Sequence, residues 1–369
     1  MATIALDATL TVEPNPMGSA VYSRRLIECL ASLATPHHFL LCYRLSRLRQ
    51  YRRFLRPRRA PEPSRPTFSL RIFQEPFTFW LRYEAEVFHS LGQRPPAFRF
   101  PKEIVTIHDV IPLTGRDYST PEYQRKFSGL LLQAVARAVR VVTPTQHSAE
   151  QLIQHTGARR DQVRVIPLGV DLPETQMSPE RRREERERFV GKGCEMLLSV
   201  GAIDNRKNTL NILRALERMP AHYHLVIAGK DGYGSQAVHD FIRREQLTSR
   251  VSVLGYVPGD RLASLYEASS ALVFVSFEEG FGLPLLEAMA HGVPVVASQA
   301  SCLPEVCGNA ALFADPHDHA EIAERIMQIV EDGRLREKMI QQGWVRAREF
   351  PWCRTAEETC RVYDEVLAL

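Results

Sequence analysis

Short runs of β-branched and other apolar residues alternate with amphipathic stretches along nearly the whole chain. Runs such as residues 3–7, 38–43 and 196–201 have the length and composition of buried strands. Stretches such as residues 19–33 and 235–245 repeat apolar positions close to helical spacing. Strands that alternate with helices favour parallel sheets covered by helices, so the chain is predicted to be an α/β protein.

The same pattern continues on both sides of a polar segment near the middle of the chain. In the first half it predicts further strands at 68–73, 86–89, 103–108, 140–143 and 163–167, and a helix at 148–156. In the second half it predicts strands at 224–228, 251–254, 272–277 and 294–298, and helices at 208–218, 261–268, 284–290 and 320–331. Two α/β series of similar size predict two Rossmann-like domains.

The polar segment between the two series is predicted to be an interdomain linker. Residues 178–190 form a highly charged helix whose start, Ser178-Pro179-Glu180, has the residue types of a helix N-terminus. The predicted domains are therefore 1–172 and 173–350. The last segment, 355–369, is predicted to be a helix that returns to the N-terminal domain with Val362, Val366 and Leu367 on its apolar face.

Composition narrows the class of protein. The 369 residues are 44% hydrophobic and 24% charged, which is typical of a folded globular chain. A formal net charge of +4 does not indicate a nucleic-acid-binding protein, and no apolar run approaches the ~18 residues that span a bilayer. The start of the chain lacks the basic flank of a signal peptide, and the seven cysteines include no C-x-x-C pair. A cytoplasmic protein with no metal is expected.

Residues 44–65 are strongly basic, with nine arginines and one acid, Glu62. Apolar residues recur there at three-to-four spacing, which predicts a basic amphipathic helix. Three interpretations stay open. One is a solvated basic loop or helix, and another is a helix packed on its own domain. The third is a docking patch for an anionic acceptor or for anionic lipid at the inner membrane surface.

The most informative block follows the predicted strand 272–277. It begins Glu279-Gly280-Phe281-Gly282-Leu283-Pro284, in which the two glycines permit a tight loop and the proline suits the start of a helix. A helix N-terminus at the end of a strand is an anion site. Glu287 is expected in the first turn of that helix, where its carboxylate can accept the hydroxyls of a ribose. The alternative is a purely structural turn whose acids face water.

Three further positions are candidate functional residues. Arg206-Lys207 follow a predicted strand, and two adjacent cations can stabilise a diphosphate as it gains charge. His108 ends the predicted strand 103–108, and Gly18 follows the first strand, where backbone can approach a phosphate or an acceptor. The alternatives are a solvated Arg-Lys pair, a histidine satisfied within the fold and an incidental glycine.

These motifs together resemble a known family. The Glu-x7-Glu spacing within EGFGLPLLEAMAHGVPVV resembles the donor-site block of family 4 retaining glycosyltransferases, and residues 200–208, 107–112, 143–148 and 166–171 are similar to other family segments. The likeness covers essentially the full chain, is dense in the second half and is sparse across residues 44–100. It implies the GT-B fold, in which two Rossmann-like domains face each other across a cleft and a C-terminal helix crosses back.

The resemblance also implies roles for the candidate residues. Arg206 and Lys207 would hold the departing diphosphate, Glu279 the sugar hydroxyls and Glu287 the ribose. His108 would contact the donor sugar. The remaining implied donor contacts are Gly18, Gly280, Phe281, Gly282, Leu283 and, near the base, the backbone of Tyr256 and Val257.

The implied reaction is metal-independent transfer from a GDP- or UDP-linked sugar, with mannose preferred, to a glycan or lipid-linked acceptor. The chain contains no Asp-x-Asp, the metal-binding pair of the other large glycosyltransferase fold. No cofactor beyond the nucleotide sugar is expected. Two alternatives stay open: an epimerase-type enzyme on the same fold, and a non-catalytic protein that binds nucleotide sugars.

Overall fold

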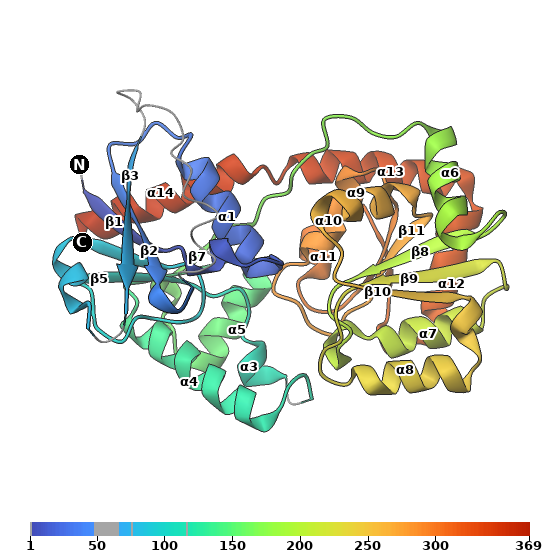
Figure 1. The fold of residues 1–369 in the computed structure, drawn as a ribbon, viewed down its shortest axis with the longest axis horizontal. Helices are drawn as coiled ribbons and strands as arrows, with labels where there is room; N and C mark the ends of the chain where they lie inside the picture. Colours follow the sequence, from blue (N-terminus) through green and yellow to red (C-terminus); the bar gives the residue numbers. More distant parts are fainter. Residues whose placement is uncertain (1, 48–65, 75–76, 116) are drawn as a thin grey trace. The chain divides into compact units, whose positions relative to one another are not determined.

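The computed structural model describes residues 2–47, 66–74, 77–115 and 117–369, and the chain divides into two compact units. Unit 1 comprises residues 1–113, 122–169 and 350–369, and unit 2 comprises residues 114–121 and 170–349. Each unit is built on a parallel sheet with helices against it (Figure 1). The predicted α/β class with two Rossmann-like domains is confirmed.

The described residues of unit 1 form a parallel sheet in the order β3-β2-β1-β4-β5-β6-β7. Its strands are β1 Thr3–Asp7, β2 His38–Arg44, β3 Thr67–Phe73, β4 Val87–Ser90, β5 Lys102–Thr106, β6 Arg140–Thr143 and β7 Val163–Val165. The helices of this part are α1 Gly18–Leu30, α3 Ile111–Thr114, α4 Pro121–Arg137, α5 Gln146–Thr156 and α14 Trp352–Ala368. The strand order reverses between β1 and β4, the arrangement that places ligand sites in doubly wound sheets.

The C-terminal helix packs on unit 1, as predicted. Val362 and Val366 of α14 are buried, and the helix lies against α1 and β4. Polar contacts tie it further, because Thr355 Oγ1 donates to the carbonyl of Pro167 at 2.8 Å and Glu365 pairs with Arg140 at 2.6 Å. The chain therefore passes from unit 1 to unit 2 and ends in unit 1 again.

The described residues of unit 2 form a parallel sheet in the order β10-β9-β8-β11-β12-β13. Its strands are β8 Glu195–Val200, β9 Tyr223–Ala228, β10 Val251–Gly255, β11 Ala271–Phe274, β12 Val295–Ser298 and β13 Leu312–Ala314. Its helices are α6 Pro179–Val190, α7 Thr209–Glu217, α8 Ser235–Arg244, α9 Gly259–Ala268, α10 Leu283–Ala290, α11 Leu303–Cys307, α12 His319–Glu331 and α13 Gly333–Arg348.

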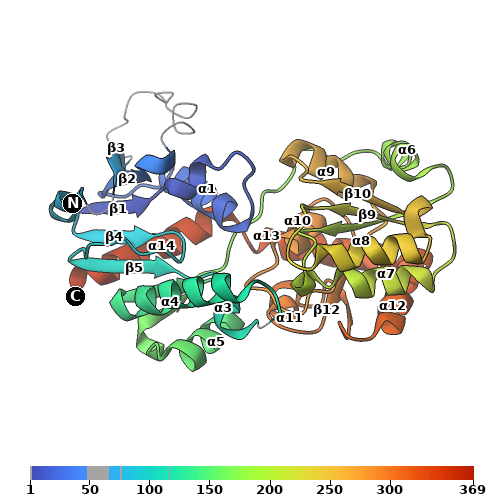
Figure 2. The same ribbon diagram turned by 60° about the horizontal axis from the view of Figure 1, so that its bottom comes forward.

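Helices cover both faces of the unit 2 sheet. Helices α7, α8 and α12 pack over one face, which Figure 2 brings forward, and bury a large apolar cluster against the strands. Helices α6, α9, α10 and α13 lie on the other face (Figure 1). Because both faces are covered, the inner strands β11 and β12 are buried at every residue and are nearly continuous apolar runs, which is why they are readable from the sequence.

Several local predictions differ from the structure. The strand predicted at 103–108 ends at Thr106, so His108 lies in the loop beyond it. Helices α4, α11 and α13 and strand β13 were not predicted. Arg44 ends β2 and a 3₁₀ turn covers Leu45–Arg47, whereas the rest of the predicted amphipathic helix, residues 48–65, lies outside the described residues.

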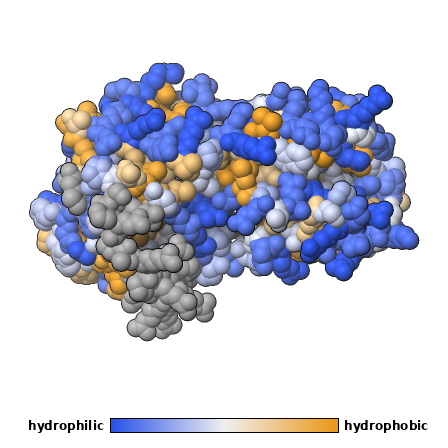
Figure 3. Space-filling model, turned by 90° about the horizontal axis from the view of Figure 1, so that it is seen from above, coloured by the Kyte–Doolittle hydropathy of each residue, from blue (hydrophilic) through white to orange (hydrophobic). Residues whose placement is uncertain are grey.

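An aromatic surface follows the basic segment in the chain. Phe77, Phe79, Trp80 and Tyr83 are each more than half exposed, from 51% to 72%. Apolar residues lie among hydrophilic ones on the face of unit 1 shown in Figure 3. Among the described residues, no helix combines the length and apolarity needed to cross a membrane. We call Phe77, Phe79, Trp80 and Tyr83 the aromatic surface.

Two histidines are enclosed in unit 1. The ring nitrogens of His89 lie 2.8 Å from Tyr363 Oη and 2.9 Å from Thr106 Oγ1, which links β4 to α14 and β5. Burial, with a smaller contribution from His108, lowers the pKa of His89 to about 3. Burial also lowers the pKa of His108 to about 4. Both rings are therefore neutral in the native state near neutral pH.

Stability should fall as the solution is acidified from pH 7 to pH 5. Below the ordinary histidine pKa of about 6.5 the unfolded chain binds protons that native His89 and His108 do not, so each contributes a loss of up to about 1.4 kcal/mol per pH unit. The measurement is the melting temperature against pH. His89→Gln should melt lower at pH 7 with a flatter pH dependence, and a replacement of the exposed His155 should not flatten it. Equal slopes for all three proteins would contradict the prediction.

Candidate functional site

The candidate residues of unit 2 meet where its strand order reverses. Strands β8 and β11 are parallel neighbours, so the loops after them leave the same edge of the sheet. The 3₁₀ turn Asn205–Lys207 follows β8, and Glu279 follows β11. The N–H of Phe277 donates to the carbonyl of Arg206 at 2.9 Å, which joins the two loops.

Glu279 receives both predicted cations. Arg206 Nη1 lies 2.7 Å from Glu279 Oε2, and Lys207 Nζ lies 2.6 Å from Glu279 Oε1. Arg206 Nη1 also donates to the carbonyl of Glu278 at 2.9 Å. The Glu279 side chain is 9% exposed, so these pairs are shielded from water and salt more than surface pairs are. Lys207 and Glu279, which are 72 positions apart in the chain, thus form one ion cluster with Arg206.

The cluster sets the protonation states of its members. Burial alone would raise the pKa of Glu279, but Arg206 and Lys207 outweigh it and hold that pKa at about 2. Burial lowers the pKa of Lys207, and Glu279 opposes this effect. Glu279 is therefore a carboxylate throughout the physiological range. An anion that binds Arg206 and Lys207 must share them with this carboxylate or displace it.

Neighbouring residues fix the position of Lys207. Gly201 has φ +136°, and a Cβ there would lie 2.8 Å from Lys207 Cε, so the absence of a side chain makes room for the lysine. Asp204 Oδ1 accepts from the backbone N–H of Lys207 at 2.9 Å. Asn208 adopts a left-handed conformation, and its Nδ2 donates to the carbonyls of Val275 and Pro316.

Asp204, Asn208 and Ser301 were missed as supporting residues. Ser301 Oγ accepts from the N–H of Glu279 at 3.0 Å and donates to its carbonyl at 2.9 Å. Asp204 and Asn208 flank Arg206-Lys207, and their preference for caps and left-handed turns was a readable signal. Ser301 lies 22 residues from Glu279, and no local pattern indicates that pairing.

The loop from Glu279 leads directly into α10, as the glycines predicted. Gly282 has φ +93° and is the N-cap of the helix, and a Cβ there would lie 2.9 Å from Leu285 Cδ1. Gly280 and Phe281 precede it, and Leu283 is the first helical residue. One expectation is wrong: Glu287 is the fifth residue of α10, beyond the first turn, which contains no acid. Its Oε2 accepts a hydrogen bond from Tyr266 at 2.7 Å.

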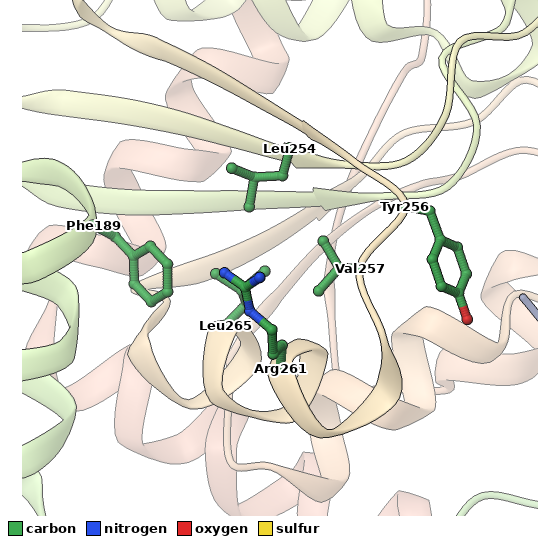
Figure 4. Close-up of a pocket in the computed structure, with 6 residues that line it drawn as sticks. All are labelled: Phe189, Leu254, Tyr256, Val257, Arg261 and Leu265. Atoms are coloured by element: carbon green, nitrogen blue, oxygen red, sulfur yellow. The ribbon is translucent and has the colours of Figure 1, made fainter.

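Tyr256 and Val257 follow β10 at the edge of the same sheet. Lys230 Nζ lies 5.3 Å from the centre of the Tyr256 ring, a cation–π contact. Both residues line a small pocket, together with Phe189, Leu254, Arg261 and Leu265. Figure 4 shows the Val257 side chain directed toward Arg261 and Leu265, whereas the Tyr256 ring is turned away from Phe189.

His108 and Gly18 belong to unit 1. Gly18 is the first residue of α1 and is exposed. His108 forms a hydrogen bond with the backbone of Leu91, and its Nε2 is buried with no partner among the described residues. Because the ring is neutral and its other nitrogen is already bonded, Nε2 can accept a hydrogen bond from a hydroxyl group. The roles of all these residues toward a ligand stay predictions.

Comparison with known proteins identifies relatives of both halves. Residues 16–174 match the family described as Glycosyltransferase Family 4, and residues 180–345 match the one described as Glycosyl transferases group 1. O-antigen chain mannosyltransferase B of Escherichia coli is 29% identical over 285 residues, which are 76% of this chain and 74% of that protein. For the other curated relatives compared, the alignment spans between 34% and 62% of the relative.

Solved structures share the fold. Sucrose-phosphate synthase from Thermosynechococcus elongatus aligns over 100% of both chains with a TM-score of 0.77 and 20% identity. Anabaena Alr3699/HepE, solved in complex with UDP and glucose, aligns over 99% of both chains with a TM-score of 0.74 and 19% identity. This chain therefore shares its fold with both of these solved proteins.

Proposed function

Since this chain belongs to glycosyltransferase family 4, we propose that it transfers a hexosyl group from a nucleoside-diphosphate sugar to a glycan or lipid-linked acceptor, with retention of configuration. The observation that carries the proposal is the cluster of Arg206, Lys207 and Glu279 at the reversal of strand order in unit 2. Cations at that point meet the charge that a diphosphate gains as its bond to the sugar breaks.

The chemistry assigns one task to each group. The bond between the anomeric carbon and the diphosphate breaks through an oxocarbenium-like state, while Arg206 and Lys207 stabilise the leaving oxygen. The acceptor oxygen bonds to the anomeric carbon on the same face, and the leaving phosphate takes its proton. Glu279, which is ionised at neutral pH, accepts hydrogen bonds from hydroxyls of the sugar. Neutral His108 offers Nε2 to a further sugar hydroxyl.

The nucleotide part of the donor would lie along the loops of unit 2. Glu287 would accept hydrogen bonds from the ribose hydroxyls. The backbone from Gly280 to Leu283 lies at the start of α10, where N–H groups favour the binding of an anion. The backbone of Tyr256 and Val257 would contact the base. Mannose is the proposed sugar because the relative with the longest coverage above is called an O-antigen chain mannosyltransferase.

The test of the proposed function is a screen of GDP-mannose, UDP-glucose and other nucleotide sugars with the full chain. Binding is followed by thermal shift, and reaction products are followed with and without glycan or lipid-linked acceptors. Transfer to an acceptor supports the proposal. An altered sugar without an acceptor would instead indicate an epimerase, and binding without any turnover would indicate a non-catalytic sugar-nucleotide-binding protein.

Activity should survive removal of divalent metal. The proposal assigns the leaving-group charge to Arg206, Lys207 and the start of α10, so it requires no ion. Initial rates should be equal within a factor of about two with EDTA and with added Mg²⁺ or Mn²⁺. A complete loss in EDTA that Mn²⁺ restores would contradict the assignment of that charge to the two side chains.

We also propose that unit 1 contacts an anionic membrane surface. Arg44 pairs with Asp7 and its side chain is only 11% exposed, so the charge comes from the other arginines of residues 44–65, at about 1 kcal/mol each near anionic lipid. The aromatic surface that follows them in the chain offers rings suited to the headgroup region. Such attraction is screened within ~8 Å at physiological salt, so it should weaken as salt rises.

Co-sedimentation with liposomes tests this contact. The chain should pellet with anionic vesicles, at low salt, more than with neutral ones. A variant with Arg52, Arg53, Arg56 and Arg58 changed to serine should pellet several-fold less. A control with equal loss of charge replaces the exposed Arg181, Arg183, Arg243 and Arg244 of unit 2 and should pellet like the wild type. Equal, salt-insensitive pelleting of all three proteins would contradict the membrane contact.

A further inference from the structure

The side chain of Tyr266 on α9 lies directly behind Glu287. Tyr266 is 2% exposed, and its hydroxyl donates to Glu287 Oε2 at 2.7 Å. The short distance and the charged acceptor place this bond among the stronger hydrogen bonds of proteins. It joins α9 to α10, two helices that pack on the same face of the unit 2 sheet.

The Tyr266 ring is itself held in place. It stacks on the ring of His291, with ring centres 5.7 Å apart and an angle of 10° between the planes. His291 Nδ1 lies 3.1 Å from Glu267 Oε1, so this stacking partner is anchored by a buried acid. The hydroxyl of Tyr266 therefore has little freedom, and the carboxylate that it binds is oriented by a rigid support.

The hydrogen bond from Tyr266 gives the two carboxylate oxygens of Glu287 different roles. Oε2 of Glu287 is occupied by the phenol, whereas Oε1 has no donor within the described part of the chain. Burial raises the pKa of Glu287, and the nearby Asp171 raises it too, while the bond from Tyr266 lowers it. Tyr266 thus keeps one oxygen oriented for a ligand and favours the charged form that accepts hydroxyls best.

We propose that Tyr266 is a positioning residue for the ribose of the donor, acting through Glu287. This inference rests on the proposed function, in which Glu287 accepts the ribose hydroxyls. It extends that function by assigning nucleotide affinity to a residue that lies behind the site and does not touch the nucleotide. The expected role is in binding rather than in turnover, because the ribose is remote from the bond that breaks.

The test is Tyr266→Phe, which removes the hydroxyl and retains the ring that stacks on His291. GDP and UDP are titrated into the full chain, together with their 2′,3′-dideoxy forms. Tyr223→Phe is the matched control, because Tyr223 is also buried in unit 2 and donates to a carboxylate, Glu331, at 3.0 Å. Each variant is checked for folding by its melting temperature.

Tyr266→Phe should weaken the better-binding ribonucleotide about tenfold, in line with the loss of one hydrogen bond to a charged group. The dideoxy nucleotide should bind equally to wild type and variant, and kcat at saturating donor should stay within a factor of about two. Tyr223→Phe should leave both nucleotide affinities unchanged.

Two results would overturn the inference alone: unchanged ribonucleotide affinity in Tyr266→Phe while Glu287→Ala weakens it, or equal losses for ribo- and dideoxynucleotides. If wild type binds neither GDP nor UDP, the proposed function fails and this inference fails with it.

Discussion

Lys207→Met should lower kcat/KM for the nucleotide sugar by about 100- to 1,000-fold, the range seen when one preorganised group that stabilises a developing anion is removed. Lys207 Nζ lies 2.6 Å from Glu279 and 4.4 Å from the centre of the Phe274 ring, so its ammonium is held in place before any ligand binds. Methionine keeps the aliphatic length along Phe274 and removes only the charge and its donors.

The control for this prediction is Lys338→Met, which removes a lysine charge from the exposed surface of α13 in the same unit. Its kcat/KM should equal that of the wild type. Steady-state kinetics with the best donor of the screen is the measurement, and melting temperatures show that both variants are folded. If Lys207→Met kept the wild-type kcat/KM, the conclusion would be that Lys207 does not stabilise the leaving group.

Glu279→Gln should lower kcat about 10- to 100-fold and leave the affinity for the nucleoside diphosphate unchanged or higher. The lost turnover follows from contacts to sugar hydroxyls that strengthen in the transition state, each worth about 1.5–3 kcal/mol when the partner is charged. The diphosphate affinity is preserved because Arg206 and Lys207, which pair with Glu279 in this structure, would no longer be shared between the ligand and the Glu279 carboxylate.

The measurements are single-turnover rates and titrations of GDP and UDP with wild type, Glu279→Gln and Glu287→Ala. Glu287→Ala should show the opposite split, with weaker nucleotide binding and a smaller effect on kcat. Parallel losses of kcat and diphosphate affinity in Glu279→Gln would assign this carboxylate to ground-state binding of the nucleotide. The melting temperature of Glu279→Gln should fall, because two largely buried cations, Arg206 and Lys207, lose their ion pairs with the Glu279 carboxylate.

Local chemistry was sufficient to predict much of this site. The glycines and proline after the apolar run at 271–274 specify a loop that enters a helix, and α10 begins at Leu283, next to the predicted Pro284. Ser178 caps α6 as predicted from its residue type and position. Strands β11 and β12, which are buried at every residue, were readable because parallel strands that are covered on both faces are nearly continuous apolar runs.

Elements with weak local signals were missed. Helix α11 has five residues and strand β13 has three, too few to display a period. Helix α4 has three buried residues in 17, so its apolar stripe is thin. The strand predicted to reach His108 ends at Thr106, since apolar composition continues beyond the ladder of hydrogen bonds that defines β5.

The sequence by itself determined the α/β class, the two Rossmann-like series, the family and the identity of the charged residues at the candidate site. Those properties follow from periodicity and from motifs within about a dozen residues. Only the tertiary structure decided which groups face one another. It pairs Arg206 and Lys207 with the Glu279 carboxylate. It also hydrogen-bonds Ser301 to the Glu279 backbone and Tyr266 to Glu287.

The physical reason is that those partners lie on different strands and helices, and the order β10-β9-β8-β11 brings their ends to one edge of the sheet. Protonation depends on the same assembly, because burial and the two cations together give Glu279 a pKa of about 2 that no isolated glutamate has.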